Sequence, residues 1–599
     1  MTTAGEPGRH LEEVRRLAAQ LVGHAGQDSS PDLLGLAHQR LQPRDERRRM
    51  GVFYTPTTVA FGLARLALAG SEGAVRVCDP ACGGGAFLLA AGRVLEARGL
   101  PRARIVEDLL WGIDIDPRSV AVTSEALRLW AAETGETPRR TNVVAADALR
   151  GGLDAWPIPA EPFDVVIGNP PFQSQLSAGT ARSAADAAHL RERLGEVATG
   201  YADTASLFLV AAVEMARDGG RVALVLPESF LAARDARPAR RRVLQRAVLT
   251  DLWLAEGPVF DASVRVCAPV LERTAREQAA PATAEPAPGA PIRRWVGPGL
   301  DPVEPAPVTV AALRDAPSWS VLVADRRGVP QVELRAPSAA GSSAGSLGAP
   351  SPGAGAGPPT RSALPGRLGD LARATAGFRD QFYGVAPYVR EAAEPPERSP
   401  RALAPLITSG AIDPLRCLWG RRPVRFAGRR WAAPVVDLGA LRDHDSRLGR
   451  WADAVLVPKV VIATQTRILE AAVDETGTWW PSVPVVAVTA PPEQLWAVLA
   501  VLLAPPVSAW AMHRTAGSAL SADAMKLAAR EVLEIPLPPR AGPWEEAAAL
   551  LRDGAAAAAA DDGLRWRDRL VRAGEAMTEA YGTGGDALAW WAARLPRFR

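Results

Sequence analysis

The chain has 599 residues, of which 48% are apolar and 23% are charged, and its net charge is +3. At about 100–200 residues per domain this length predicts three or four domains, and the composition excludes a single small module, a wholly disordered chain and a fibrous protein. A charge so nearly balanced does not by itself indicate a nucleic-acid partner.

In chain order, composition and hydrophobic patterning divide the sequence into five segments. Residues 337–366 consist almost entirely of Gly, Ala, Pro and Ser. Such a stretch has no core to bury, so we expect a disordered insertion there. The expected segments are a helical lead-in (1–50), a wound α/β domain (51–278), a connecting segment that contains the insertion (279–366), a mixed α/β domain (367–540) and an Ala-rich helical tail (541–599).

Short β-branched runs alternate with amphipathic stretches between about residues 75 and 272. This alternation is typical of a sheet wound with helices on both faces. We expect strands at 75–79, 111–115, 142–147, 163–169 and 221–227, and helices at 86–98, 117–133 and 203–218.

The first expected strand runs directly into the sequence DPACGGGAF, residues 79–87. A glycine turn between a strand and a helix brings backbone N–H groups against an anionic ligand group. The dinucleotide fingerprint G-x-G-x-x-G is incomplete here, because Leu88 stands three residues after Gly85. A different nucleotide-like ligand therefore fits better, and a tight turn without a ligand stays open as an alternative.

The next two expected strands each end in an acid, Asp114 and Asp147. In a wound sheet these strand ends open into one crevice beside the glycine turn. Asp114 can accept hydrogen bonds from two ribose hydroxyls, and Asp147 can accept one from the exocyclic amine of adenine. Together the turn and the two acids predict an S-adenosylmethionine pocket, although each acid alone fits a solvated loop equally well.

The fourth expected strand ends in the tetrapeptide Asn169-Pro170-Pro171-Phe172. Two prolines fix the backbone, which aims the Asn169 side chain and the Pro170 carbonyl into the crevice as a pair of acceptors. Such a pair can hold both protons of a planar amine and leave the nitrogen lone pair for an electrophile. Phe172 can stack on a base extruded from a duplex.

These motifs, with GVFYTP at residues 51–56 ahead of them, resemble those of DNA adenine-N6 methyltransferases in the γ order, similar to the Eco57I and TaqI-like methylases. The segment LLGLAHQRLQ before them looks like the helical lead-in of the larger enzymes in that group. GSALSADAM (517–525) and EIPLPP (534–539) look like the closing part of a TaqI-like recognition domain. One departure is Ala205, where relatives carry an aromatic residue.

The resemblance implies a Rossmann-like S-adenosylmethionine-dependent methyltransferase domain with a mixed seven-stranded sheet, followed by a mixed α/β target-recognition domain. It also implies site residues. The catalytic set is Asn169, Pro170, Pro171, Phe172 and Phe260, and the cofactor-binding set is Phe53, Tyr54, Thr55, Pro56, Asp79, Ala81, Gly83, Gly85, Phe87, Asp114, Ile115, Asp147 and Ala148.

An arginine-rich stretch lies in the expected recognition domain, where six arginines and no acids between 416 and 431 alternate with Trp419, Phe426 and Trp431. Arginine can hold phosphates or fork onto guanine edges. We expect DNA contacts from Arg421, Arg422, Arg425 and Arg429. The alternative is genome composition, since only two of the 69 basic residues are lysines.

The function implied is site-specific methylation of the N6 amine of a flipped adenine in double-stranded DNA, with S-adenosylmethionine as cofactor, in a restriction-modification or related defence system. A separate restriction endonuclease or defence partner is compatible with it. Fifty residues ahead of the methylase motifs are too few for a nuclease, so we expect modification without cleavage. Two alternatives stay open: an RNA or protein glutamine N-methyltransferase, and a non-catalytic DNA-binding component of a defence system.

Cysteine and histidine usage bears on the compartment and on metals. The four cysteines are too few and too scattered for a disulfide framework, and the histidines do not join them at zinc-ligand spacing, so we expect no metal. The sequence has no N-terminal signal pattern and no apolar run of 18 residues. We expect a reduced, cytoplasmic protein that does not engage a membrane.

Overall fold

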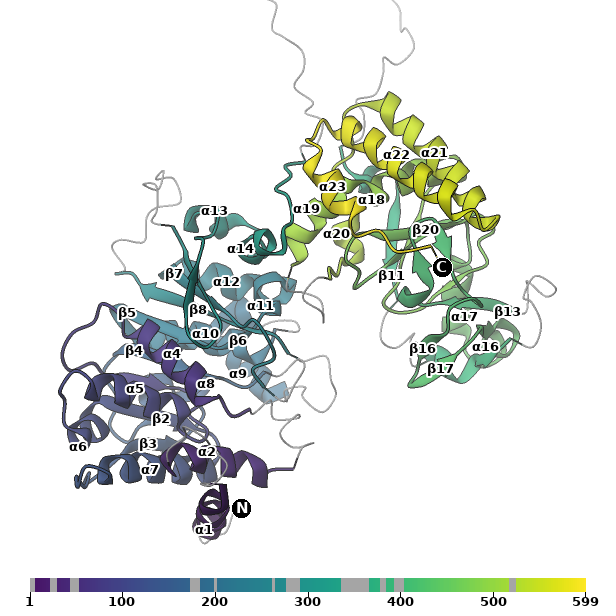
Figure 1. Ribbon diagram of the computed structural model, residues 1–599. Coiled ribbons are helices and arrows are strands. Elements are labelled where there is room, and N and C mark those ends of the chain that lie inside the picture. Colours follow the sequence, from purple (N-terminus) through teal and green to yellow (C-terminus); the bar gives the residue numbers. More distant parts are fainter. Residues whose placement is uncertain are drawn as a thin grey trace, which may run out of the picture. The chain divides into compact units, whose positions relative to one another are not determined.

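A computed structural model describes the chain as two compact units, residues 1–322 and 323–599 (Figure 1). Their boundary falls within the connecting segment expected at 279–366. Most of the Gly/Ala/Pro/Ser stretch, the arginines at 44–49, Gly51 and most of the GSALSADAM segment lie outside the described residues. The structure describes residues 6–21, 30–43, 53–172, 184–198, 202–260, 264–275, 291–334, 366–377, 384–392, 403–516 and 524–598.

The first unit is built on one mixed sheet with the order β10-β9-β7-β8-β5-β4-β1-β2-β3, and the short β6 pairs with β8. The strands β3, β2, β1, β4 and β5 run parallel, whereas β8 is antiparallel to β5 and β7. The bounds are β1 Val77–Asp79, β2 Leu110–Asp114, β3 Asn142–Ala145, β4 Phe163–Gly168, β5 Ala216–Leu224, β6 Leu226–Pro227, β7 Ala247–Leu254, β8 Val266–Arg273, β9 Arg293–Val296 and β10 Asp301–Val303.

This sheet is wider than the seven strands expected, because β9 and β10 extend it beyond β7. Asp251 on β7 is fully buried and explains the attachment. Its carboxylate accepts from Arg221 at 3.0 Å, from Arg293 at 2.8 Å and from the Trp295 indole at 2.8 Å. A buried carboxylate requires such partners. Two of them, Arg293 and Trp295, lie on β9, so part of the segment expected to be a connector belongs to the sheet.

The helices of this unit cover both faces of the sheet, as right-handed crossovers on either side of a switch in strand order require. α1, α2, α4, α5 and α7 share one apolar core with the sheet, and α10 packs on β4 and β5. The bounds are α1 Glu6–Leu21, α2 Ser30–Leu41, α4 Thr57–Ala67, α5 Ala86–Glu96, α6 Arg102–Arg104, α7 Pro117–Ala132, α8 Ala148–Gly151, α9 Ala184–Leu194, α10 Thr204–Met215, α11 Ser229–Ala232, α12 Arg237–Leu244, α13 Val310–Asp315 and α14 Val321–Ala324.

Aspartates start several of these helices, and two of the three stand just after a strand. Asp116 caps α7 through the Arg118 amide at 2.9 Å, and Pro117 occupies its first turn. Asp147 caps α8, and Asp203 caps α10. An acidic side chain at this position satisfies an otherwise unpaired helix N–H group. The strand-to-helix turns that surround the crevice are therefore fixed by local sequence.

The second unit contains several small sheets. β11, β22, β19 and β20 form one, β12, β18, β13 and β21 form another, and β14-β15 and β16-β17 are hairpins. The bounds are β11 Arg373–Ala376, β12 Val389–Glu391, β13 Leu403–Ile407, β14 Ile412–Asp413, β15 Arg416–Cys417, β16 Val424–Phe426, β17 Arg429–Trp431, β18 Pro434–Asp437, β19 Lys459–Ala463, β20 Glu470–Asp474, β21 Trp480–Pro481 and β22 Val486–Thr489.

The Ala-rich tail packs into this unit as three helices, with α21 and α22 side by side along α18 (Figure 1). Trp566 on α22 is fully buried and donates its indole N–H to the Pro414 carbonyl at 3.1 Å. The bounds are α16 Leu438–His444, α17 Ser446–Val455, α18 Leu495–Leu503, α19 Pro505–Thr515, α20 Ala529–Leu533, α21 Ala541–Ala559, α22 Gly563–Tyr581 and α23 Asp586–Ala592.

Among the described residues, no single helix is long and apolar enough to cross a membrane. One bent pair, 492–503 with 505–515, reaches the required length and composition when its two helices are taken together.

Candidate active site

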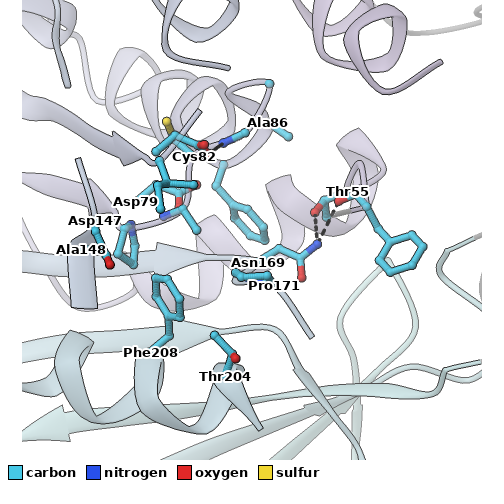
Figure 2. Close-up of a pocket in the computed structure, with 18 of the residues that line it drawn as sticks. Thr55, Asp79, Cys82, Ala86, Asp147, Ala148, Asn169, Pro171, Thr204 and Phe208 are labelled. Atoms are coloured by element: carbon cyan, nitrogen blue, oxygen red, sulfur yellow. Dashed lines mark hydrogen bonds between the residues drawn. The ribbon is translucent and has the colours of Figure 1, made fainter. Parts of the chain in front are cut away.

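The carboxyl ends of β1, β2, β3 and β4 open into one cavity of the first unit (Figure 2). Figure 2 shows Asp147 and Ala148 toward one end, Thr55 toward the other, and Asn169 with Pro171 between them. The predicted residues that line this cavity are Phe53, Tyr54, Thr55, Asp79, Ala81, Gly83, Phe87, Asp114, Ile115, Asp147, Ala148, Asn169 and Pro171. The sequence thus named side chains from five separate segments that the fold brings together.

The glycine turn is held in shape from several sides. Gly83 and Gly85 have φ angles of 51° and 87°, a conformation that side chains rarely adopt. The Gly83 N–H donates to Asp114 Oδ2 at 2.8 Å, and the Thr123 hydroxyl donates to the Gly83 carbonyl at 2.6 Å. A turn fixed in this way holds its shape before any ligand arrives.

Two buried carboxyl groups lie beside the turn, Asp79 and Asp114. Burial raises the pKa of Asp79 to about 8, against a hydrogen bond from the Ala81 amide at 3.0 Å, and the Asp114 charge raises it further. Burial likewise raises the pKa of Asp114 to about 6, although the Gly83 and Asp116 amides each donate to one of its oxygens and oppose the shift. A cation bound here would therefore gain from both carboxylates.

The end of the cavity beyond Asp114 can receive a flat ring. Ile115 is 65% exposed, unusual for a large apolar side chain, and it lines the cavity with Ala148. Asp147 directs one oxygen to the Leu149 amide at 2.9 Å and the other toward Arg150 at 3.4 Å. Phe208 on α10 also lines this space, and Figure 2 shows its ring pointing into it. Apolar faces beside a carboxylate acceptor suit adenine.

Asn169 stands at the end of β4 with its carboxamide fixed. Its Nδ2 group donates to the Phe53 carbonyl and to Thr55 Oγ1, each at 3.1 Å (Figure 2). A carbonyl only accepts, so this contact fixes which side of the amide carries the oxygen. Oδ1 is buried, and no described residue donates to it. An unpaired buried acceptor costs free energy, and a ligand N–H at this point would satisfy it.

Three phenylalanines form a cluster next to Asn169. Phe53 and Phe260 stack with ring centroids 5.6 Å apart, and Phe172 meets Phe260 edge-on at 6.1 Å. Phe172, Pro170 and Gly85 are not among the described residues that line the main cavity, and Pro170 and Gly85 are buried. Pro56 and Phe260 line a second hollow that adjoins the first through Tyr54. The aromatic side chains expected against a base therefore lie together at the Asn169 end.

Sequence reasoning missed several residues of the site. Gly35, His38 and Gln39 line the cavity from α2, and Gln42 lines it from just beyond the end of that helix, inside a segment interpreted only as a lead-in. Thr123 was missed because it lies within a helix, far from any motif. Phe208 comes one turn after Ala205 on an almost wholly apolar helix, where nothing in the periodicity marks a ligand-facing position. It supplies an aromatic ring near the position where Ala205 departs from the family pattern.

The arginines of residues 416–431 have different environments in the second unit. Arg416 is buried, with its guanidinium 3.9 Å from the Phe598 ring centre, so it stabilises the core. Arg422 forks onto the buried Asp413 at 2.9 and 3.0 Å, and Arg421 pairs with Asp561 at 2.6 Å. Arg425 and Arg429 are exposed on the β16-β17 hairpin.

Comparison with known proteins adds family information to this geometry. Residues 38–282 match the family model described as N-6 DNA Methylase. The Type II methyltransferase M.VspI of Vibrio sp. (strain 343) is 23% identical over 220 residues, which are 37% of this chain and 47% of that protein. The match thus spans less than half of this curated relative.

A solved structure of the Type IIL restriction-modification enzyme MmeI in complex with DNA is similar in fold. The likeness has a TM-score of 0.57 at 12% sequence identity and covers 94% of this chain and 80% of that one. At this identity the likeness concerns the fold alone. It agrees with the expected architecture, a methyltransferase domain of Rossmann type followed by an additional mixed α/β domain.

Proposed function

Because residues 38–282 match the family model described as N-6 DNA Methylase, we propose that this chain transfers a methyl group from S-adenosylmethionine to the N6 amine of an adenine in double-stranded DNA. One observation carries the proposal. Asn169 presents to the cavity a buried oxygen to which none of the described residues donates, and the far end of that cavity has the form of a nucleoside site. An exocyclic amine supplies the N–H that this oxygen lacks.

From one end of the cavity to the other, the lining residues fit the successive parts of S-adenosylmethionine. Asp147, Ala148, Ile115 and Phe208 would receive the adenine, Asp114 the ribose hydroxyls, and the glycine turn with Asp79 the charged remainder. Asp79 and Asp114 are acids whose pKa values burial raises, so a cationic ligand would favour their ionised forms. When bound, the cofactor supplies an electrophilic methyl group on a positively charged sulfur.

The main contribution of the protein would then be to orient the target amine toward this methyl group. Asn169 Oδ1 would accept a hydrogen bond from one N–H of the target amine, and the adjacent Pro170 carbonyl is the candidate acceptor for the second N–H. If the two acceptors draw these hydrogens out of the ring plane, the nitrogen becomes tetrahedral and its lone pair leaves conjugation. The lone pair would then form the N–CH3 bond as the S–CH3 bond of the cofactor breaks, with S-adenosylhomocysteine as the leaving group, and one amine proton would be lost to solvent. Phe172, Phe260 and Phe53 offer apolar faces to an adenine extruded from the stack.

Substrate DNA would be held by the second unit, through exposed arginines such as Arg425 and Arg429. A role in a restriction-modification or related defence system, with or without a separate nuclease, belongs to the same proposal. It is supported by the kind of proteins that the first unit resembles.

Methylation-sensitive sequencing of DNA from cells that express the chain tests the proposal and reads the recognition sequence together. We expect N6-methyladenine at one sequence motif, and its loss when Asn169→Ala replaces the wild type. If the cellular DNA is unmodified and the purified protein methylates RNA or a glutamine peptide, the substrate belongs to the alternative class. Purified protein that binds DNA but transfers no methyl group would indicate a non-catalytic component.

A further inference from the structure

Helix α2 lies with its backbone directly against the glycine turn. A Cβ atom built on Gly35 would stand 3.0 Å from the Gly84 carbonyl oxygen and 2.9 Å from Tyr54 Cε2. A Cβ built on Gly84 would stand 2.4 Å from the Gly35 Cα. Side chains at either position would collide with backbone, so this pair of glycines permits an approach that other residues exclude.

Polar contacts fix α2 in this position from three elements. Arg93, on the helix that follows the glycine turn, forks onto the buried Asp32 at 2.9 and 2.6 Å. The Tyr54 hydroxyl donates to the Asp32 carbonyl at 3.3 Å. His38 Nε2 lies 3.2 Å from Ser119 Oγ on α7. A forked pair of this kind holds geometry as well as charge, so these contacts favour one position of α2 against the turn.

Two amide side chains, one on α2 and one directly after its last residue, line the cavity. Gln39 and Gln42 are half-buried and line it together with Gly83, Asp114 and Asn169. Both also line the second hollow, beside Tyr54 and Phe260, and so belong to the Asn169 end rather than to the Asp147 end. A carboxamide both donates and accepts, which suits a ligand group that carries an ammonium and a carboxylate.

We propose that α2 is part of the cofactor site: Gly35 is a positioning residue that lets the helix brace the glycine turn, and Gln39 and Gln42 bind the amino-acid end of the cofactor. The inference rests on the proposed function, because it takes S-adenosylmethionine as the ligand. It assigns a ligand-binding role to a segment whose sequence indicated only a helical lead-in.

Calorimetric titration with two probes tests the glutamines. S-adenosylhomocysteine carries the amino-acid end, and 5′-methylthioadenosine lacks it. Gln39→Ala and Gln42→Ala should each weaken S-adenosylhomocysteine by about ten- to a hundredfold, as for the loss of one hydrogen bond to a charged group, and leave 5′-methylthioadenosine unchanged. Equal weakening of both probes, or of neither, would overturn the assignment to the amino-acid end.

A matched pair of glycine variants tests the brace. Gly35→Ala should weaken both probes by about tenfold or more and raise KM for S-adenosylmethionine with little change in KM for DNA. Gly8→Ala is the control, since a Cβ on this α1 residue meets no atom within 4 Å. A Gly35→Ala protein that binds both probes as the wild type does would overturn the brace.

Two outcomes separate this inference from the proposed function. Wild-type protein that binds the probes and methylates DNA, with the Gly35, Gln39 and Gln42 variants equal to it, would overturn the role of α2 and leave the methyltransferase standing. Wild-type protein that binds neither probe would overturn both. If Gly35→Ala fails to fold, the glutamine variants still decide the question, because their truncation introduces no clash.

Discussion

The carboxamide nitrogen of Asn169 lies 3.1 Å from the hydroxyl oxygen of Thr55, although 114 residues separate the two in the chain. Both residues were predicted for the site, but in different roles: Asn169 for catalysis and Thr55 for the cofactor. The contact joins these roles, because Thr55 and the neighbouring Phe53 carbonyl determine where the Asn169 oxygen points. Orientation fixed before substrate arrives costs nothing during the reaction.

The first prediction concerns Thr55. Thr55→Val keeps the shape of the side chain and removes the acceptor, so the Asn169 amide loses one of its two anchors. We expect kcat to fall by about two- to tenfold, since a neutral hydrogen bond contributes about 0.5–1.5 kcal/mol. Thr55→Ser, which keeps the hydroxyl, should remain close to the wild type. Equal activity in the valine and serine variants, measured by methyl transfer to DNA, would exclude the anchoring role.

The second prediction concerns Asn169 itself. Asn169→Ala removes the acceptor that prepares the amine, so turnover should fall by orders of magnitude while the cofactor still binds. Single-turnover methyl transfer and calorimetric cofactor binding, measured on the same preparation, separate the two effects. Methylation at the wild-type rate would refute the proposed chemistry.

The third prediction concerns Asp114 as the ribose acceptor. Asp114→Ala should weaken S-adenosylmethionine by about 1.5–3 kcal/mol, the range for hydrogen bonds to a charged group. Asp114 also holds the Gly83 amide, and part of this loss will come from a loosened turn. An unchanged cofactor affinity in titration calorimetry would remove Asp114 from the site.

The fourth prediction is a pH dependence of cofactor binding. The pKa of Asp114 is raised to about 6 by burial, so the carboxyl of the free protein takes up a proton as pH falls through that value. A cationic ligand favours the ionised form, and below about pH 6 its binding must first remove this proton. The pKa of Asp79 is raised to about 8 by burial, so Asp79 contributes in the same way at higher pH. We expect S-adenosylmethionine affinity to be highest above about pH 8 and to decline below that value through Asp79. Below about pH 6 Asp114 should add a further fall of up to about tenfold per pH unit.

The control for this pH dependence is Asp114→Asn, which cannot ionise and should show a flatter profile. Calorimetry between pH 5 and pH 8, in buffers of different ionisation enthalpy, would also detect the proton released on binding. An identical affinity of the wild type at pH 5.5 and pH 7.5 would contradict the prediction.

The fifth prediction separates the arginines of the second unit. On the β16-β17 hairpin Arg425 stands directly opposite Arg430, and all the hairpin's arginines are exposed. Like charges across a strand pair destabilise it, and a phosphate would relieve the repulsion. Arg425→Ala and Arg429→Ala should weaken DNA binding. If the replaced arginine contacts a phosphate, its loss should weaken binding to every sequence and reduce the slope of log binding constant against log salt concentration by about one unit. If it contacts a guanine, its loss should cost about 1–3 kcal/mol of binding free energy at one base position.

Arg422→Ala is the comparison for these variants. Arg422 holds the buried Asp413, so its removal leaves a buried carboxylate without its partner and should lower Tm. The hairpin variants should keep the wild-type Tm. Unchanged DNA affinity, salt dependence and methylated motif in both hairpin variants would show that their arginines reflect genome composition.

The sequence by itself predicted the core of the first unit and most of the residues that meet at its cavity. The five parallel strands, the glycine turn, the acids at the ends of β2 and β3 and the tetrapeptide after β4 were all predicted within a few residues. These features are local, because a strand, its turn residues and its helix cap lie next to one another in the chain, and the order of the motifs specifies which strand ends meet.

Tertiary structure alone decided the contacts between distant segments. It placed Gly35 on Gly84, aimed the amide of Asn169 at Thr55 and brought Phe208 into the cavity. It also distinguished Arg416 and Arg422, which are held within the protein, from Arg425 and Arg429, which face solvent. Composition cannot make these distinctions, since an arginine is the same residue in either setting, and only packing determines whether its charge meets a carboxylate, an aromatic ring or water.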